Sequence, residues 1–351
     1  ISDHIVTLLT NHVIYLRRKD EKELDLKKNK KNSFSFFIIA MGKLGSFELN
    51  YSSDIDIILF FNCNYTNIKD HFETKQFIIN KFKKLVKILT NFSEGDFLYR
   101  VDLRLRPDPS STPIAIDTKF AENYYQKLGR TWERMAFIKA RPVCGDIKKG
   151  KEFLKKLDSF IWRNHFDYAA IDEVKNLREK MKLNSPYLKL YDLSGYNIKT
   201  GLGGIRDIEL FTQTYQLIVA GRNRELRGAK TLKTLNKLKE LGWLDHETFE
   251  KLVRAYNFFR TIENRLQIVN NTQNQNIPNE SSPQFNQLAT LTGFASCSKF
   301  KDLVLQNLKN VKLITDDFFS NFKFRNVQKK NFLDTEIIKS NEGKLGCILS
   351  T

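Results

Sequence analysis

Residues 36–46 read FFIIAMGKLGS, and seven residues later residues 54–59 read DIDIIL. Both apolar runs predict strands, over 34–42 and 54–61. Because side chains alternate along a strand, Asp54 and Asp56 share one face while their apolar neighbours face a core. Two close carboxylates are hard to keep ionised without a cation, and oxygen ligands suit Mg²⁺. The glycine-rich turn can bring backbone N–H groups close to a phosphate, so the two parts together predict a nucleotidyl-transfer site. The alternative is an aspartate pair that caps the end of a strand.

A third strand is predicted over residues 98–106, because residues 99–107 read YRVDLRLRP and alternate polar with apolar. This alternation places Arg100, Asp102, Arg104 and Arg106 on one face. Guanidinium groups chelate phosphate oxygens, so a row of arginines around one carboxylate suits bound phosphates. The alternative is that Asp102 pairs with Arg100 or Arg104, and that Arg104 and Arg106 are ion-pair partners of the acids.

The order of the predicted elements indicates two domains. Predicted helical segments accompany the strands: a helix and a charged connection over 1–30, helical spacing from Lys69 to Leu89, and a helical pattern over 117–140. Strands and helices in this order predict an α/β unit over 1–147 with its core at 34–145. Five apolar stripes then predict a helical bundle over 148–325, followed by a loosely ordered tail over 326–351. The stripes begin at Ile171, Ile208, Leu232, Tyr256 and Leu303.

Four blocks of sequence resemble glutamine synthetase adenylyltransferase, in that family's order. They are MGKLGSFELNYSSDID at 41–56, RVDLRLRP at 100–107, GRTWERMAFIKARPV at 129–143 and GGIRDIE at 203–209. More broadly, the Gly-Ser turn, the acid pair and the later Asp102 resemble the DNA polymerase β superfamily. The resemblance implies an α+β fold, with a polymerase β-like nucleotidyltransferase domain followed by an all-α helical bundle domain. It also implies that Asp54, Asp56 and Asp102 are metal ligands for Mg²⁺.

The family's enzyme has two nucleotidyltransferase halves that catalyse opposite reactions, so the half that a chain resembles implies the direction of its reaction. The first half uses orthophosphate to remove AMP from a tyrosine of glutamine synthetase and releases ADP, and the second attaches AMP from ATP. The block at 129–143 resembles the removing half, and the chain carries a single acid-pair cassette. Its start at Ile1 instead of Met is typical of a fragment of a longer parent. The direction of the reaction rests on this resemblance alone.

The resemblance also implies roles for individual residues and partners. Catalytic roles fall on Asp54, Asp56, Asp102, Arg104 and Arg106, and roles in binding substrate or phosphate fall on Lys43, Gly45, Ser46, Arg206 and Glu209. Lys43 could also lie on the surface, the glycines at 201–204 could form only a tight turn, and Glu133, Arg134, Lys139 and Arg141 could form a structural ion-pair network. The implied partners are glutamine synthetase, the PII signal protein, nucleotides (ADP or ATP) and orthophosphate, in the cytoplasm.

Composition excludes several other classes. The formal net charge of +18 is spread along the chain, without interleaved aromatic residues, so nucleic acid is not the expected partner. No apolar run reaches the ~18 residues of a membrane span, and the four cysteines are too far apart for a metal site. Two rival functions remain: a nucleotidyltransferase for another acceptor, such as PII or an RNA end, and a non-catalytic docking module. The three intact acids argue against the second.

Overall fold

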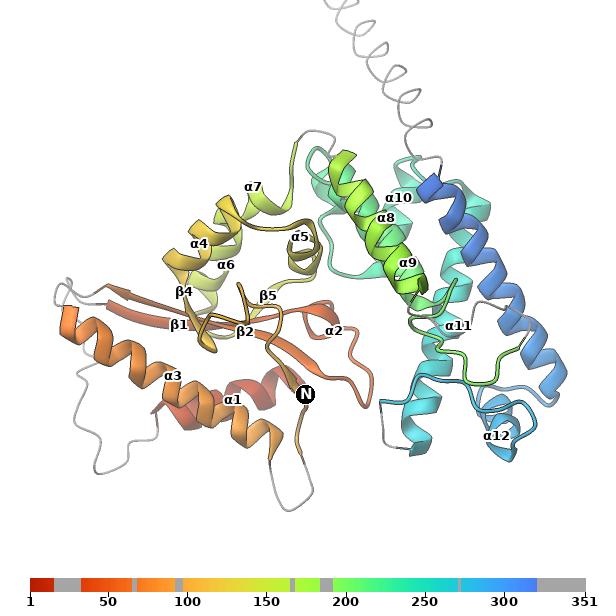
Figure 1. The fold of residues 1–351 in the computed structure, drawn as a ribbon, viewed down its shortest axis with the longest axis horizontal. Coiled ribbons are helices and arrows are strands. Elements are labelled where there is room, and N and C mark those ends of the chain that lie inside the picture. The colour runs from red at the N-terminus through yellow and green to blue at the C-terminus, as the bar shows by residue number, and fades with distance from the viewer. Residues whose placement is uncertain are drawn as a thin grey trace, which may run out of the picture. The chain divides into compact units, whose positions relative to one another are not determined.

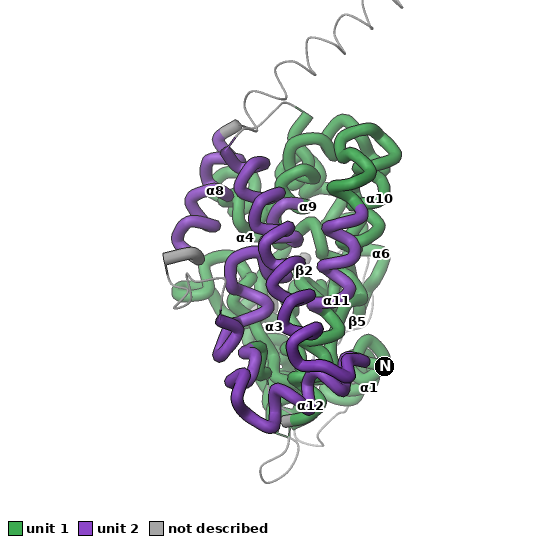
Figure 2. Tube along the Cα trace, turned by 90° about the vertical axis from the view of Figure 1, so that its right-hand side faces the viewer, with its two compact units in different colours: residues 1–167, 212–249, 260–275 green, residues 168–211, 250–259, 276–351 purple. Residues whose placement is uncertain are grey.

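The computed structural model describes residues 1–15, 33–64, 68–91, 97–164, 168–183, 192–270 and 273–320. The chain forms two compact units, coloured separately in Figure 2. Unit 1 comprises residues 1–167, 212–249 and 260–275, and unit 2 comprises residues 168–211, 250–259 and 276–351. The predicted tail at 326–351 lies outside the described residues, as does most of the charged connection before residue 33. The predicted domain boundary at residue 147 stays a prediction.

Unit 1 contains a mixed five-stranded sheet. Its strands are β1 (Ser33–Ala40), β2 (Ile55–Asn64), β3 (Val101–Asp102), β4 (Ala115–Asp117) and β5 (Arg141–Gly145). The order is β3-β2-β1-β5, and β4 also pairs with β2. β1 is antiparallel to β2 and β5, whereas β3 and β4 run parallel to β2 at successive positions along it. The first two predicted strands are therefore confirmed.

The third predicted strand, 98–106, is wrong in its length, because only Val101 and Asp102 are extended in the sheet. The chain then enters turns, in which the N–H of Thr112 donates to the carbonyl of Asp108 at 3.0 Å. The Arg106 guanidinium stabilises these turns by donating to the carbonyls of Leu103, at 2.8 Å, and Pro109, at 2.7 Å. The alternation of arginine with leucine therefore does not mark a longer strand here, because the Arg106 side chain folds back onto the turns.

Helices cover both faces of the sheet within unit 1 (Figure 1). The helices α1 (Ser2–Tyr15) and α3 (Ile68–Thr90) lie on one face, and α4 (Thr118–Lys127) and α6 (Ile147–Lys156) lie on the other. Ile38, Ile57 and Leu59 pack toward α1 and α3. The alternate residues Phe37 and Phe60 contact Phe153 of α6, with ring centroids 5.6 and 4.6 Å apart. The period of two predicted from sequence therefore gives two apolar layers.

The helix predicted over 117–140 is two helices, α4 and α5 (Thr131–Phe137). The break falls at Gly129, where a Cβ atom would lie 2.3 Å from the Phe160 ring and 2.5 Å from the carbonyl of Tyr125. Unit 1 also includes α2 (Gly42–Gly45), α7 (Asp158–Ile161), η1 (Arg224–Leu226) and α10 (Thr231–Glu240). The close packing at Gly129 explains why the helical pattern is interrupted without a proline.

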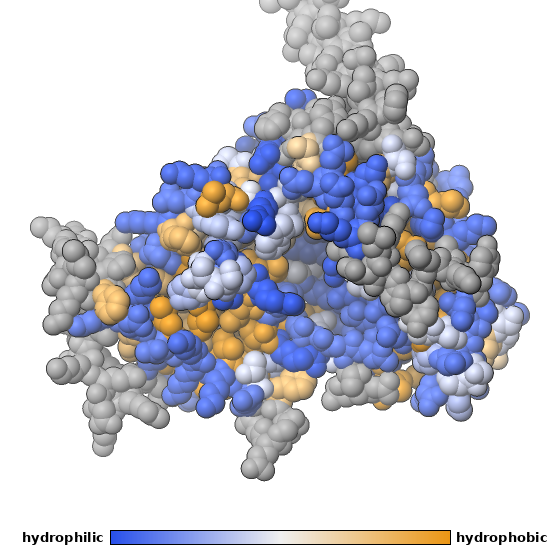
Figure 3. All heavy atoms as spheres, viewed as in Figure 1, coloured by the Kyte–Doolittle hydropathy of each residue, from blue (hydrophilic) through white to orange (hydrophobic). Residues whose placement is uncertain are grey.

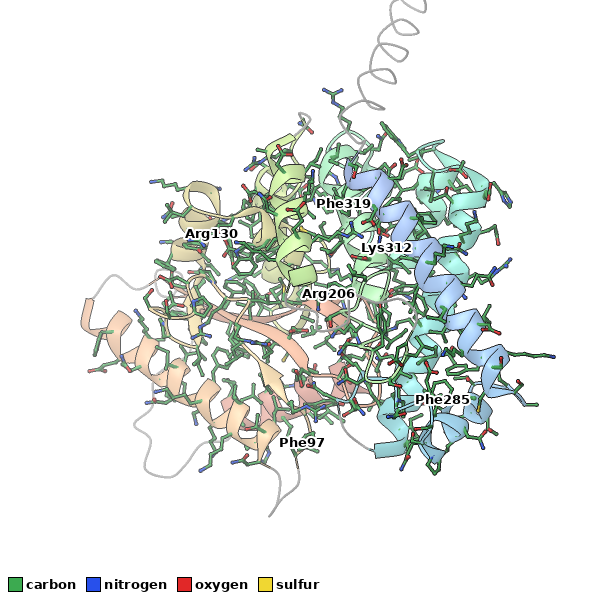
Figure 4. The ribbon with its side chains drawn as sticks, turned by 45° about the vertical axis from the view of Figure 1, so that its right-hand side comes forward. Phe97, Arg130, Arg206, Phe285, Lys312 and Phe319 are labelled. Carbon is green, nitrogen blue, oxygen red and sulfur yellow. The ribbon has the colours of Figure 1, made fainter. Side chains whose placement is uncertain are left out.

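The regular elements described in unit 2 are helices, apart from an isolated bridge between Asn197 and Asn276. It contains α8 (Tyr168–Leu183), α12 (Pro283–Leu291) and a helix over 297–320, while α9 (Ile205–Val219) and α11 (His246–Asn270) contribute residues to both units. The five predicted stripes all fall on helices, except that Leu241, the last residue of the stripe that begins at Leu232, follows the end of α10 and is 39% exposed. Figure 4 labels Lys312 and Phe319 on the helix over 297–320. Lys312 pairs with Asp316 at 2.7 Å, and the Arg178 guanidinium lies 5.2 Å from the centroid of the Phe319 ring.

The surface in the view of Figure 3 is mostly hydrophilic, and apolar side chains reach it over the sheet region of unit 1. Among the described residues, no helix combines the length and apolar character that crossing a membrane requires.

Candidate active site

Asp56 and Asp102 are brought together by the sheet. β2 and β3 pair in parallel with Asp56 opposite Asp102, so the two carboxylates share one face. Asp54 lies one residue before β2, and its carboxylate accepts a hydrogen bond from Arg100 Nε at 2.8 Å and another from Gln273 Nε2. The Arg100 guanidinium also stacks on the Phe97 ring, 4.9 Å from its centroid (Figure 4 labels Phe97).

Arg104 pairs with Asp102, which is one of the alternatives that the sequence left open. Its Nε and Nη2 atoms donate to the Asp102 carboxylate at 3.0 and 2.5 Å, and its backbone N–H donates at 2.8 Å. Burial alone would raise the pKa of Asp102, but the hydrogen bonds and charge of Arg104 lower it below its ordinary value. The Arg104 side chain is 84% exposed, and Asp102, followed by Asp56 and Asp54, raises its pKa. Arg104 is therefore a solvent-facing cation in the field of all three acids.

The oxygen donors fit Mg²⁺ through two carboxylates. In the described part of the chain, no three acidic, histidine or cysteine side chains are grouped so as to hold a metal ion. Mg²⁺ is commonly bound by one or two carboxylates together with substrate phosphates. Asp56 and Asp102, which lie opposite each other on β2 and β3, supply two such carboxylates. The role of Asp54 as a third ligand stays a prediction.

The glycine-rich turn packs directly against Asp56. Gly42 has a φ of +50°, and a Cβ atom there would lie 2.5 Å from Asp56 Oδ2. The N–H of Met41 donates to the Asp56 carbonyl at 2.9 Å, which ties the turn to the start of β2. Gly42 was missing from the predicted site residues. Its signal in the sequence was a glycine directly after a strand, at a position that needs both a positive φ and close approach.

Gly45 and Ser46, predicted to bind phosphate, are committed to the turn in this conformation. The N–H of Gly45 donates to the carbonyl of Met41 at 2.8 Å, and a Cβ atom at Gly45 would lie 1.8 Å from the carbonyl oxygen of Lys139. The hydroxyl of Ser46 is buried and donates to the carbonyl of Gly42 at 3.1 Å. These contacts are structural, and a phosphate-binding role for either residue stays a prediction.

Lys43 is held by a buried carboxylate that sequence reasoning missed. Its Nζ atom lies 2.8 Å from Oε1 of Glu263, whose Oε2 accepts from Arg260 Nη1 at 2.9 Å. Burial acts to raise the pKa of Glu263, but Lys43 and Arg260 together lower it, so the carboxylate stays charged. The two ends of the Lys43–Glu263 contact are 220 residues apart in sequence, and therefore no local pattern could reveal it.

The polar residues of the 129–143 block make separate structural contacts. Glu133 accepts from the N–H of Arg130 at 2.8 Å, capping α5, and its burial raises the pKa of its carboxyl. Arg134 is buried and donates to the carbonyl of Ile161 at 3.4 Å. Lys139 donates to Glu48 Oε2, also at 3.4 Å.

Arg141 contacts both α2 and the N-terminal helix α1. Its guanidinium forms a bidentate pair with Asp3, at 2.8 and 2.9 Å. It also donates to the carbonyls of Leu44 and Gly45 and stacks on Phe47, 3.7 Å from the ring centroid. Arg141 thus supports the turn that contacts Asp56.

The glycines at 201–204 form a packed turn. The N–H of Gly203 donates to Asp207 Oδ2 at 2.8 Å, and Asp207 forms a buried bidentate pair with Arg178. Gly203 has a φ of +78°, and a Cβ atom there would lie 2.2 Å from the Leu308 carbonyl oxygen. These contacts support the tight-turn interpretation. Arg206, labelled in Figure 4, and Glu209 lie on α9 in unit 2, and their roles at the site stay predictions.

Comparisons with known proteins agree with the resemblance found in the sequence. Residues 3–156 match the family described as glutamate-ammonia ligase adenylyltransferase, and residues 175–319 match the family described as GlnD PII-uridylyltransferase. Bifunctional glutamine synthetase adenylyltransferase/adenylyl-removing enzymes are similar along much of the chain. That of Rhizobium meliloti (strain 1021) is 40% identical over 78% of this chain and 28% of the relative. That of Bartonella quintana (strain Toulouse) is 40% identical over 80% of this chain and 29% of the relative.

These matches place the chain among proteins related to nucleotidyltransferases. More narrowly, its residues 3–156 are similar to the glutamate-ammonia ligase adenylyltransferase family. The chain spans less than a third of the length of the curated relatives that it matches.

Proposed function

We propose that this chain is a Mg²⁺-dependent nucleotidyltransferase that removes AMP from an adenylylated tyrosine of glutamine synthetase and releases ADP. The observation that supports it best is the parallel pairing of Asp56 with Asp102 beside the Gly42 turn, within residues that match the adenylyltransferase family. The names of the relatives include both attachment and removal of the adenylyl group. The resemblance of residues 129–143 to the removing half favours removal.

Asp56 and Asp102, joined by Asp54, are the residues that would hold the metal. Bound there, Mg²⁺ would neutralise negative charge on the attacking and leaving oxygens. An orthophosphate oxygen attacks the phosphorus of AMP, the bond from phosphorus to the tyrosine oxygen breaks, and the tyrosine oxygen takes up a proton. The products are ADP and unmodified tyrosine, so atoms and charge balance.

Arg104 is the side chain best suited to orient orthophosphate. It is exposed, it lies beside the carboxylates, and among the described residues its guanidinium is hydrogen-bonded to Asp102 alone. A rotation of this long side chain away from Asp102 would present a guanidinium to phosphate oxygens. Arg106 donates to several backbone carbonyls, so we assign it the role of holding the loop that follows β3.

Partners follow from the same proposal. Glutamine synthetase is the protein substrate named in the relatives, and the match of residues 175–319 to a PII-uridylyltransferase family supports the PII signal protein as a regulator. We place this activity in the cytoplasm, where glutamine synthetase and orthophosphate would be available together.

The test is a pair of assays on the purified chain. In the first, glutamine synthetase carrying labelled AMP is incubated with Mg²⁺ and orthophosphate, and labelled ADP is the expected product. In the second, unmodified glutamine synthetase is incubated with labelled ATP, and little labelling of the protein is expected. Robust labelling from ATP without phosphate-dependent release would show that the chain is the attaching half, and no reaction in either direction would refute the proposal.

A further inference from the structure

A row of polar side chains from residues 260–273 follows the segment that leads into the acid pair. We call that segment, residues 42–54, the site loop. Arg260, Glu263 and Gln267 are spaced by three and four residues, so they lie on one face of α11. Gln273 follows the end of that helix, and both segments belong to unit 1.

The contacts advance along the site loop in step with the helix. Arg260 Nη2 donates to the carbonyl of Glu48 at 2.6 Å and to Asn50 Oδ1 at 2.5 Å. Two helical turns further along α11, the N–H of Ser52 donates to Gln267 Oε1 at 3.4 Å. Gln273 then donates to the carboxylate of Asp54. The loop is therefore held at alternate residues, from its middle to the first acid.

Glu263 pairs with two cations, one within the site loop and one that contacts it. It is fully buried, and its two oxygens accept from Lys43 Nζ at 2.8 Å and from Arg260 Nη1 at 2.9 Å. Lys43 lies at the start of the site loop beside Gly42, and Arg260 holds its middle. Removing the charge of a buried, paired carboxylate leaves its cationic partners uncompensated, so both attachments depend on one side chain.

We propose that Glu263 is a positioning residue for the active site. Together with Arg260, Gln267 and Gln273 it forms a third part of that site, beside the turn at Gly42 and the strands β2 and β3. Glu263 acts through Lys43 and Arg260 and sets the path of the loop that delivers Asp54 and Asp56. Its kinetic consequence rests on the proposed function, whereas its effect on the loop does not. A nucleotidyltransferase fragment that ends at residue 147 would lack this support.

The test compares Glu263→Gln with Asp316→Asn as a matched control. Asp316 also pairs with one arginine and one lysine, Arg178 at 2.7 Å and Lys312 at 2.7 Å, but within unit 2. For each variant, thermal stability, kcat and KM for phosphate-dependent release of AMP, and hydrogen–deuterium exchange of residues 48–54 are measured. We expect Glu263→Gln to speed exchange of the loop about 10-fold and to lower kcat by about 10-fold or more, because small misplacements of reacting groups are costly.

The control separates positioning from general stability. Asp316→Asn is expected to leave loop exchange and kcat within about 2-fold of the wild type, even where its loss of thermal stability equals that of Glu263→Gln. Equal loop exchange and equal kcat in the two variants would overturn the proposal. Gln267→Ala serves where Glu263→Gln fails to fold, because it removes the acceptor of the Ser52 N–H, and unchanged exchange of that amide would also overturn it. A wild-type chain without turnover would refute the proposed function, while the exchange measurements would still decide the positioning role.

Discussion

Replacing Gly42 by alanine should separate the geometry of the acid site from the stability of the fold. A Cβ atom at Gly42 would lie 2.5 Å from Asp56 Oδ2, whereas ordinary contact begins at 3.4 Å. The Asp56 carboxylate or the turn must therefore move by about 0.9 Å, the difference between these two distances. A misplacement of about 1 Å at a reacting centre can cost on the order of 10² in rate.

The same substitution also strains the backbone, because Gly42 has a φ of +50°. A side chain in the left-handed region costs about 1–2 kcal/mol of stability. Gly242 offers a matched control in the same unit, since it has a φ of +70° but a Cβ atom there would meet nothing within 4 Å. Gly242→Ala should therefore lose a similar amount of stability without displacing any carboxylate.

The measurements are urea unfolding and phosphate-dependent release of AMP for both variants. We expect similar losses of unfolding free energy, with turnover lowered about 10²-fold in Gly42→Ala and within about 3-fold of the wild type in Gly242→Ala. Equal turnover in the two variants would refute the reasoning that close contact between Gly42 and Asp56 sets the position of the carboxylate.

Asp56→Asn should lower turnover by about 10²-fold or more at unchanged thermal stability, because it removes charge and keeps shape; near-normal rates would remove the metal-site interpretation. Arg104→Ala should raise the orthophosphate concentration needed for half-maximal rate, since its side chain is 84% exposed and faces the acids; a collapse of stability with unchanged phosphate dependence would make Arg104 only an ion-pair partner. Burial raises the pKa of Glu133 above its ordinary 4.5, so the folded state binds this proton more tightly than the unfolded state, and stability contributed there falls as pH rises from 4.5 through the raised value. Glu133→Gln should remove this part of the decrease in unfolding free energy with rising pH, as measured by urea unfolding at pH values from 4.5 upward. An unchanged slope of unfolding free energy against pH would contradict the prediction.

Predictions of strands succeeded where both faces of the strand are buried. The apolar runs at 36–40 and 57–61 predicted β1 and β2 because each of these strands packs against helices on both sides. The alternation at 99–107 belongs to a strand only as far as Asp102. Beyond it, Arg106 donates to nearby carbonyls and Arg104 donates to the Asp102 carboxylate, instead of both facing one side of a sheet. A period of two over a few residues therefore does not identify a strand by itself.

Asp54, Asp56, Asp102 and the glycine-rich turn could be selected from sequence as candidates for the site, because their chemistry depends on residue type and short spacing. Sequence also revealed the resemblance to the family, since four blocks follow one another in that family's order. Only the tertiary structure decided which groups meet: Asp56 with Asp102 by the register of β2 and β3, and Lys43 with Glu263 across 220 residues. Such pairings follow from how the whole chain packs, and packing joins residues whose spacing in sequence has no period to detect.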